Sequence, residues 1–584
     1  MTMDTYIKTK DTSVKKIPYG ICDFERIRTQ DYWYADKTMY IPVLENSASF
    51  LSLLRPRRFG KSLFLSMLEC YYDINQKEKF ATLFGDLWIG SHPTENANRF
   101  QILRLDFSKA HGSGTDIKDS FYAYLAVSLD SFMDKYKDVY PKSFVENFMS
   151  EPNVASKLLM LDNKARQSGY PLYLIIDEYD NFTNVVLANE GHEAFHAITH
   201  TNGFYRETFK IFKGMFERVL LMGVSPITLD DLTSGYNIDT NVSQDPELNS
   251  ILGFSESEVR SMISYYHDKK VVNRPVEEII KEIRPWYDGY CFSLKQYGKE
   301  SVYNCDMVLY YLSAWQRSGN APVEMVDKNI RTDFSKLNML MRLDHTHPEQ
   351  EREDFLQQIS ATGYVNMTLR TSFSAVEVME RDKFLSLVYY MGMLTIGGEY
   401  WDEYHMIIPN LCVQEQYWSF MRHKFNRIHK LTDGDVKETI REMARGEWHP
   451  FVRMISQAIH KMWSVRSSIK GEYLIQGYFE AYLSQDNNLF IVKPEREMNG
   501  GYCDILVLPN RARFPQVKDG YILELKYLNP ATPDNAICES AEKGRTQLRK
   551  YSNDDIFKGI LPDTAIHRVL LLFRGPDLLI AEEL

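Results

Sequence analysis

The first candidate functional residues are Gly60, Lys61 and Ser62, which follow an apolar stretch, residues 51–54, and a basic turn. Free N–H groups and a positive dipole end make the start of a helix attractive to phosphate. A lysine there reaches the terminal phosphates, and the serine hydroxyl reaches Mg²⁺. The segment therefore predicts a phosphate-binding loop. Because Arg55 replaces the first glycine of the pattern G-x-x-x-x-G-K-S/T, a basic surface turn is the alternative for this segment alone.

A second segment, residues 172–180, supplies the acids that such a loop needs, because its apolar strand ends in Asp177 and Glu178. Continuous apolar strands belong to buried parallel sheets, and their carboxyl ends face the ligand crevice. We expect Asp177 to hold Mg²⁺ and Glu178 to polarise the attacking water. A buried strand that ends in a solvated acidic turn is the alternative, but the two segments in this order favour a nucleotide site.

Two further apolar stretches, residues 101–107 and 218–225, are predicted strands of the same sheet. A strand between the phosphate loop and the acidic strand, with a glutamate beside the metal-binding aspartate, resembles the arrangement in ATPases of the AAA and related kinds. Ser225 or Thr228, after the last strand, would then sense the γ-phosphate. An ordinary cap of the strand-to-loop turn explains either residue equally well.

A second group of candidate residues lies near the C-terminus, where Asp504 opens an apolar strand and a later strand carries Glu524 and Lys526. Alternate side chains of a strand share a face, so Glu524 and Lys526 point the same way while Leu523 and Leu525 enter the core. Two such carboxylates bind Mg²⁺, and Mn²⁺ also fits, while a neighbouring lysine positions water and stabilises charge on a phosphate. A hairpin with a surface E-x-K ion pair is the alternative.

Flanking segments complete this group. Glu472 lies in a helix-like stretch, and residues 543–551 are typical of a basic helix on which Gln547 and Tyr551 share a face. The cations of this helix expected to contact phosphate are Arg545, Arg549 and Lys550. The whole series predicts a metal-dependent nuclease centre more strongly than the E-x-K pair does alone.

Length and composition indicate a globular protein of about three or four domains, since 584 residues exceed what one core accommodates. The chain lacks both a long apolar stretch and a signal-peptide core, so we expect a cytoplasmic protein without a membrane partner. Seven cysteines without a C-x-x-C pair indicate neither a disulfide framework nor a zinc ribbon. The net charge of −11 argues against a surface coated for nucleic acid, but it allows a local site in the neutral C-terminal portion.

The motifs together resemble a known family. Residues 16 to about 315 are similar to the AAA-ATPase-like domain, whose own phosphate loop reads Arg-Pro-Arg-Arg-Phe-Gly-Lys-Ser, so that Arg55 fits the family pattern. The similarity extends to four short motifs: residues 17–20, 34–38, 253–259 and 286–290. Residues from about 470 resemble the PD-(D/E)XK nuclease domain that accompanies such ATPases.

The resemblance implies ATP and Mg²⁺ as cofactors. At the nucleotide site it implies Arg58, Gly60, Lys61, Ser62, Asp177 and Ser225 as binding residues, with Glu178 as a catalytic residue. At the nuclease centre it implies Glu472, Asp504 and Glu524 as metal positions, Lys526 and Gln547 as further catalytic residues, and Tyr551 as a neighbour of Gln547. The family often has Gly-Arg close before the strand aspartate, whereas residues 501–503 here are Gly-Tyr-Cys.

The expected fold class is α/β with four parts. These are a P-loop NTPase domain with a parallel sheet over residues 1–240, a helical lid over 241–315, a winged-helix-like and helical linker region over 316–450, and an α/β restriction-endonuclease-like domain over 451–584. The winged prediction rests on a helix flowing into a strand over residues 382–396, a turn at 397–399 and a second strand through 406–408. Such wings more often pack between neighbouring domains than contact DNA.

A competing motif is His192-Glu193-Ala194-Phe195-His196, followed by His200. On a helix this spacing would place three imidazoles on one face, as zinc hydrolases require. The motif lies between two predicted sheet strands amid polar residues, where we expect a loop or short polar helix. We therefore prefer a solvated insertion to a peptidase site.

Two functions from different classes follow. The preferred one is an ATP-dependent, Mg²⁺-requiring nuclease that acts on nucleic acid, DNA rather than RNA, in defence or mobile-element biology. The alternative is an ATP-switched adaptor or nucleic-acid-binding protein with an inactive nuclease-like domain. The oligomeric state stays open, a homo-oligomer included.

Overall fold

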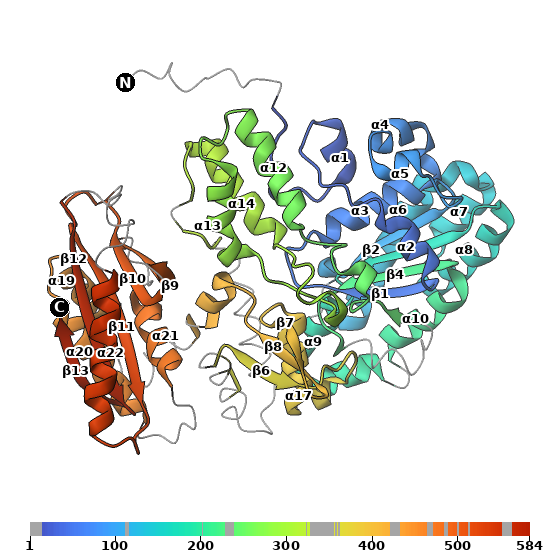
Figure 1. Ribbon diagram of the computed structural model, residues 1–584. Helices are drawn as coiled ribbons and strands as arrows, with labels where there is room; N and C mark the ends of the chain where they lie inside the picture. Colours follow the sequence, from blue (N-terminus) through green and yellow to red (C-terminus); the bar gives the residue numbers. More distant parts are fainter. Residues whose placement is uncertain are drawn as a thin grey trace. The chain divides into compact units, whose positions relative to one another are not determined.

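The computed structural model of the chain divides into two compact units, which are described separately (Figure 1). The first is drawn from residues 1–347 and 366–412, and the second from 348–365 and 413–584. The structure describes residues 14–110, 116–200, 203–227, 239–322, 324–327, 355–356, 359, 362–417, 419–420, 433–463, 471–483, 489–498, 501–511, 514–551 and 563–584.

The first unit is built on a parallel sheet with the strand order β2-β3-β4-β1-β5. Its strands are β1 (Phe50–Leu54), β2 (Gln101–Asp106), β3 (Leu172–Asp177), β4 (Arg218–Gly223) and β5 (Thr240–Asn241). Every residue of β3 is buried, as expected for a strand covered on both faces. The carboxyl ends of β1 and β3 open at the same edge with only β4 between them, which brings the phosphate loop and the acidic strand together.

Helices follow the strands of this sheet, and α3 packs against β2 and β3 while α6 packs against β2. The helices of this part are α1 (Phe24–Thr29), α2 (Tyr40–Asn46), α3 (Lys61–Tyr72), α4 (Phe80–Phe84), α5 (Trp88–Ser91), α6 (Ile117–Tyr136), α7 (Lys142–Ser150), α8 (Val154–Ser168), α9 (Asn181–Thr199) and α10 (Phe204–Met215). The parallel sheet and its helices confirm the α/β class expected for the N-terminal part.

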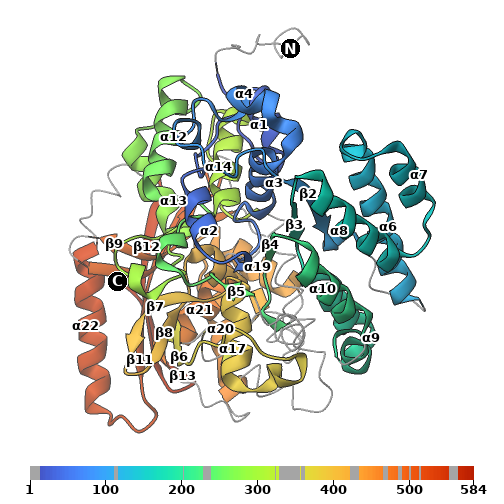
Figure 2. The ribbon, with the colours of Figure 1, turned by 90° about the vertical axis from the view of Figure 1, so that its right-hand side faces the viewer.

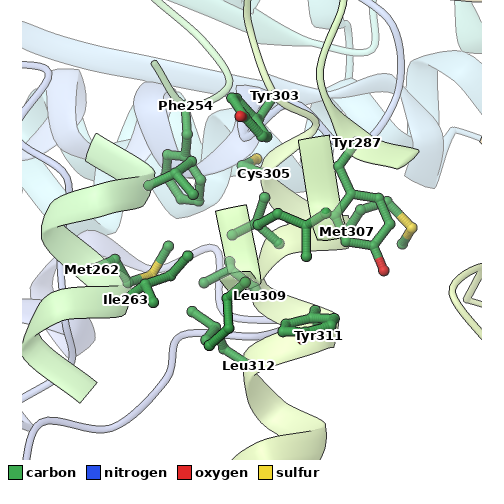
Figure 3. Close-up of a cluster of buried hydrophobic side chains, with 14 of the residues drawn as sticks. Phe254, Met262, Ile263, Tyr287, Tyr303, Cys305, Met307, Leu309, Tyr311 and Leu312 are labelled. Carbon is green, nitrogen blue, oxygen red and sulfur yellow. The ribbon is translucent and has the colours of Figure 1, made fainter. Parts of the chain in front are cut away.

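Three helices after the sheet, α12 (Glu256–Asp268), α13 (Val276–Tyr287) and α14 (Cys305–Ser318), share one apolar cluster. Figure 3 shows its side chains converging from the helices and from the segments before them: Phe254, Met262, Ile263, Tyr287, Tyr303, Cys305, Met307, Leu309, Tyr311 and Leu312. Ser255 and Glu258 form a capping box that starts α12. The cluster matters for function because four of its members, Ala35, Phe254, Cys305 and Leu309, also line the cavity described below.

The middle of the chain contains α17 (Arg381–Tyr390) and the strands β7 (Thr395–Tyr400) and β8 (Glu403–Ile407), with β6 (Tyr364–Met367) on the other side of β8. The predicted turn at 397–399 is wrong, because these residues lie within β7 and the chain reverses at Trp401 and Asp402. Gly398 has a φ of +138°, and the pairing with β8 shifts register beside it. The glycines therefore serve a β-bulge, in which a side chain is poorly tolerated.

The second unit is a mixed sheet with the strand order β13-β12-β11-β10-β9. Its strands are β9 (Phe490–Met498), β10 (Gly501–Pro509), β11 (Asp519–Leu528), β12 (Ala565–Arg574) and β13 (Asp577–Glu583), and its helices are α19 (Asp433–Met443), α20 (His449–Trp463), α21 (Glu472–Leu483) and α22 (Asn535–Tyr551). Helix α22 covers one face, and α20 and α21 cover the other (Figure 1 and Figure 2). A Cβ at Gly544 would lie 2.5 Å from Leu570, so glycine lets α22 approach the sheet closely. Among the described helices, none has the length and apolar character needed to cross a membrane.

Candidate nucleotide site and candidate nuclease centre

The phosphate loop lies between β1 and α3 at the carboxyl edge of the parallel sheet. Gly60 precedes α3 with a φ of 87°, a conformation that glycine adopts without strain. Lys61 and Ser62 form the first turn of the helix, and Arg58 also has a positive φ, of 66°. All four residues line one cavity, so the structure brings together the predicted loop residues.

This cavity has a volume of about 430 Å³, which lies in the range of small-molecule sites. Glu178 also lines it, and the remaining wall is largely apolar: Ile21, Ile27, Trp33, Ala35, Leu252, Phe254 and Leu309. These wall residues were not predicted from the sequence as ligand contacts. The available signal was the short family motifs, since Pro18, Gly20, Tyr34 and Lys37 also line the cavity.

Lys61 is held against its own loop. Its Nζ donates hydrogen bonds to the carbonyl oxygens of Arg55 at 3.0 Å and Pro56 at 2.9 Å. Burial lowers the pKa of the Lys61 ammonium, although Glu178 and Asp177 oppose this shift. The lysine is thus fixed across the loop, where phosphate oxygens can replace the two carbonyls as acceptors.

Arg55, the departure from the common glycine pattern, is a buried anchor of the loop. Its guanidinium donates to the carbonyls of Ser243 at 2.7 Å and Leu248 at 2.8 Å, and it lies 4.2 Å from the centre of the Phe292 ring. Burial lowers its pKa to about 10. At 1% exposure Arg55 does not fit the alternative of a basic surface turn.

Asp177, at the end of β3, lies beside the first turn of α3 as predicted. Burial raises the pKa of its carboxyl, and the Ser62 hydroxyl, Arg104 and Lys61 act in the opposite direction. Its Oδ1 atom is buried and has no hydrogen-bond partner among the residues that the structure describes. Buried polar atoms are normally satisfied, and carboxylate and hydroxyl oxygens are ligands that Mg²⁺ prefers, so the pair Ser62 and Asp177 fits this ion.

Glu178 and Ser225 follow the ends of β3 and β4. Glu178 has a φ of 48°, and its carboxylate accepts a hydrogen bond from Asn181 at 2.7 Å. Ser225 is buried; its N–H donates to Asp180 at 2.8 Å, and its hydroxyl accepts from the N–H of Ile227. These contacts cap the turn after β4, while contact of Ser225 with the γ-phosphate stays a prediction. Thr228 lies outside the described residues.

In the second unit, β11 presents the E-x-K residues as the sequence predicts. Lys526 Nζ lies 2.8 Å from Glu524 Oε1, and both Leu523 and Leu525 are buried. Asp504 on β10 accepts a hydrogen bond from the N–H of Leu525 at 2.6 Å. The neighbouring strand therefore delivers its carboxylate directly to β11.

The charges at this centre are unbalanced. Glu524 is 0% exposed, and burial and the neighbouring Asp504 raise its pKa to about 7 against the opposing effect of Lys526. Glu524 Oε2 is buried and lacks a hydrogen-bond partner within the described part of the chain. Two adjacent carboxylates repel each other unless a cation lies between them, so this pair fits a divalent metal ion.

Glu472 approaches the same strand from α21, where its carboxylate accepts a hydrogen bond from the N–H of Tyr527 at 3.2 Å. The described residues contain no group of three or more His, Cys, Asp or Glu side chains arranged around a metal position. A metal at this centre would therefore depend on Asp504 and Glu524, and direct ligation by Glu472 stays a prediction.

The last turns of α22 approach the centre from the other side. The side chain of Gln547 is hydrogen-bonded to Tyr551, and burial and the charge of Glu524 raise the pKa of the Tyr551 hydroxyl. Arg545 is committed elsewhere, because its Nε lies 2.6 Å from Glu582 on β13 and its Nη1 lies 3.2 Å from Glu542. Arg545 was predicted to contact phosphate, because its partner on β13 is distant in the sequence.

The histidine motif lies in α9, which is longer than the short helix or loop expected there. The helix breaks at Gly191, whose φ is 84°, directly before His192. His196 is exposed, and its ring stacks on His200 with centroids 3.7 Å apart. The motif thus occupies a separate short helical segment after this break. The side chain of His192 lies outside the described part of the structure.

The strand order, the loop before α3 and the acidic end of β3 define a P-loop ATPase type of domain, and the mixed sheet with Asp504, Glu524 and Lys526 defines a nuclease type of domain. Protein-family models agree: residues 18–233 match the family described as Predicted AAA-ATPase, and residues 470–583 match the PD-(D/E)XK nuclease superfamily. The chain therefore contains an AAA-ATPase-like domain and a C-terminal PD-(D/E)XK nuclease superfamily domain, which confirms the resemblance seen in the sequence.

A curated relative is an uncharacterized protein in the vnfD 5' region of Azotobacter chroococcum mcd 1. It is 27% identical to this chain over an alignment of 309 residues, and the alignment covers 51% of this chain and 52% of the relative. The chain thus spans about half the length of the curated relative that it matches.

Proposed function

We propose that this chain binds and hydrolyses ATP and that its C-terminal domain is a Mg²⁺-dependent phosphodiesterase acting on nucleic acid. The observation that carries the proposal is the buried carboxylate of Glu524, which has Asp504 on the neighbouring strand and Lys526 bound to it, in a chain that also has the phosphate-loop residues Gly60, Lys61 and Ser62 around one cavity. A structural ion pair would not need a second carboxylate, Asp504, beside a Glu524 whose pKa burial and Asp504 together raise to about 7.

At the nucleotide site, Lys61 would exchange its two loop carbonyls for phosphate oxygens of ATP. Ser62 and Asp177 would hold Mg²⁺, which supplies charge neutralisation at the phosphates when bound. Glu178 lines the cavity and would orient the attacking water, with Asn181 fixing its carboxylate. The apolar wall with Trp33 and Phe254 suits the nucleobase.

At the nuclease centre, Asp504 and Glu524 would hold Mg²⁺ or Mn²⁺, which supplies Lewis-acid chemistry at the phosphodiester when bound. Lys526 would orient the attacking water and stabilise the charge that develops on the phosphate, because its ammonium is fixed 2.8 Å from Glu524. Gln547 and Tyr551 would fix the same region from α22. DNA as the preferred substrate and a role in defence or mobile-element biology belong to this proposal, as does a cytoplasmic location, which was expected from the apolar pattern of the sequence.

The experiment that tests the proposal is cleavage of plasmid and of labelled oligonucleotides by the full chain with Mg²⁺ or Mn²⁺, with and without ATP. We expect cleavage by the wild type and none by Lys526→Ala, with Lys543→Ala as the matched control because Lys543 pairs with Glu539 on the exposed face of α22. Equal cleavage by wild type and Lys526→Ala would show that the activity comes from elsewhere.

A second candidate function is an ATP-switched adaptor that binds nucleic acid without cutting it. Two observations favour it: Arg545 is paired with Glu582 and Glu542, and no arginine stands directly before Asp504. Salt-dependent binding of an oligonucleotide without cleavage under any metal or nucleotide condition would support this candidate over the nuclease.

A further inference from the structure

Arg104 on β2 contacts three groups around the metal end of the nucleotide site. Its Nη2 donates a hydrogen bond to the carbonyl oxygen of Ser62 at 3.3 Å and lies 3.6 Å from Asp177 Oδ2. Its Nη1 lies 3.4 Å from Glu69 on α3. One guanidinium thus joins the first turn of α3, a later turn of the same helix and the end of β3.

Asp177 needs such a neighbour because its side chain is only 4% exposed. A buried carboxylate without a nearby cation is strongly disfavoured. Lys61 is engaged by carbonyl oxygens of the phosphate loop, so Arg104 is the cation that a salt bridge links to Asp177 among the described residues. Arg104 therefore compensates the charge of the acid that is expected to act on Mg²⁺.

The guanidinium of Arg104 is itself held in place by a network of ion pairs. Glu69 pairs with Lys135 on α6 at 2.8 Å, and Lys135 also pairs with the buried Asp73 at 2.7 Å. This chain of ion pairs ties Arg104 to α3 and α6, outside the nucleotide cavity. Because a fixed neighbour orients the group it touches, the network limits the positions that Asp177 can take.

We propose that Arg104 is a positioning residue of the nucleotide site, which holds Asp177 and the first turn of α3 so that Ser62 and Asp177 act on the same Mg²⁺. The inference rests on the proposed ATP site. The planar fork of arginine contacts a carbonyl and a carboxylate through separate N–H groups, which the single ammonium of lysine cannot reproduce in the same geometry. Arg104 acts through Ser62 and Asp177 and has no assigned contact with ATP.

The test is calorimetric binding of ATP to the full chain at increasing Mg²⁺ and, separately, in EDTA. For Arg104→Met we expect the Mg²⁺ concentration at half-saturation to rise by about tenfold or more, the usual effect of losing a residue that orients a metal ligand. ATP affinity in EDTA should change less than about threefold, since the phosphate contacts of Lys61 remain. Arg104→Lys should lie between Arg104→Met and the wild type.

Arg99→Gln is the matched control, because Arg99 precedes the same strand and forms an exposed pair with Glu217 at 2.9 Å. It should leave the Mg²⁺ dependence unchanged. A Mg²⁺ half-saturation in Arg104→Met equal to that of the wild type overturns the inference. If Arg104→Met does not fold, an unchanged half-saturation in Arg104→Lys overturns it instead. Failure of the wild type to bind ATP would contradict the proposed function, and this result is distinct from an unchanged Mg²⁺ half-saturation in either Arg104 variant.

Discussion

The two sites use the same kinds of residue with a different charge balance. At the nucleotide site burial raises the pKa of Asp177, and the Ser62 hydroxyl, Arg104 and Lys61 oppose this shift. At the nuclease centre burial and the neighbouring Asp504 both raise the pKa of Glu524, and Lys526 is the cation that pairs with it. Each acid nevertheless has one buried oxygen without a hydrogen-bond partner among the described residues.

This difference indicates when each site needs its metal ion. Arg104 and Lys61 oppose the charge of Asp177, so we expect the proposed nucleotide site to stay folded without a metal ion until ATP brings Mg²⁺ with it. The carboxylate pair of the nuclease centre repels itself without a divalent ion. We therefore expect the nuclease centre to bind metal in the absence of any nucleotide.

The largest effect that sharpens this comparison is expected at Lys61. Lys61→Ala should remove measurable ATP binding, because the ammonium is the proposed contact with the terminal phosphates, while its place at the start of α3, outside the strands, should leave the sheet intact. Calorimetry measures the loss of ATP binding, and circular dichroism measures whether the fold is intact. Lys79→Ala, which affects only an exposed pair with Glu25, should bind ATP normally. Unchanged ATP affinity in Lys61→Ala would contradict the site.

A second effect separates binding from hydrolysis at the same site. Glu178→Gln should keep ATP affinity and slow hydrolysis by about 10² to 10⁴, the range for loss of a general base. The carboxylate lines the cavity and no phosphate contact is assigned to it. Phosphate release measured at saturating ATP tests this. Loss of ATP affinity with an unchanged hydrolysis rate per bound nucleotide would show that Glu178 binds rather than activates.

A smaller effect separates the fold of the second unit from its metal centre. His567 lies 3.0 Å from Asp519 and 2.7 Å from Glu583, and these hydrogen bonds outweigh burial and raise its pKa above 6.5. Since the folded state holds the proton more tightly, this stabilisation is fully present below pH 6.5 and is lost as the pH rises through the raised pKa.

His567→Gln should therefore lower the free energy of unfolding of the second unit by about 1 kcal/mol at pH 6 and by less at pH 9. Urea unfolding at the two pH values measures the difference. The matched control is His460→Gln, whose exposed contact with Asp577 should contribute little. An equal loss at both pH values would show that His567 contributes by packing on Tyr521 rather than by its charge.

The sequence predicted the parts of the fold that depend on local pattern. The strands expected at residues 101–107, 172–180 and 218–225 correspond to β2, β3 and β4, because continuous apolar runs identify buried parallel strands. The E-x-K strand was likewise predicted with its faces correct, since alternation along a strand is a local property.

Contacts between distant segments could not be predicted. Arg55 finds its acceptors on Ser243 and Leu248, and Arg545 finds Glu582, so the roles of both arginines depend on the assembled fold. The glycines of β7 were placed in a turn because a bulge and a turn use the same residue type. The network of Arg104, Glu69 and Lys135 joins three elements and has no local motif.

The most direct test of the different charge balance is divalent-metal binding by the full chain without nucleotide, measured by calorimetry with Mn²⁺. We predict one Mn²⁺ per chain that is lost in Asp504→Ala and Glu524→Ala, because each removes one of the paired carboxylates. It should be retained in Lys526→Ala, which removes no ligand, and in Lys61→Ala at the other site. Absence of nucleotide-independent metal binding in the wild type, or its survival in Glu524→Ala, would contradict the account.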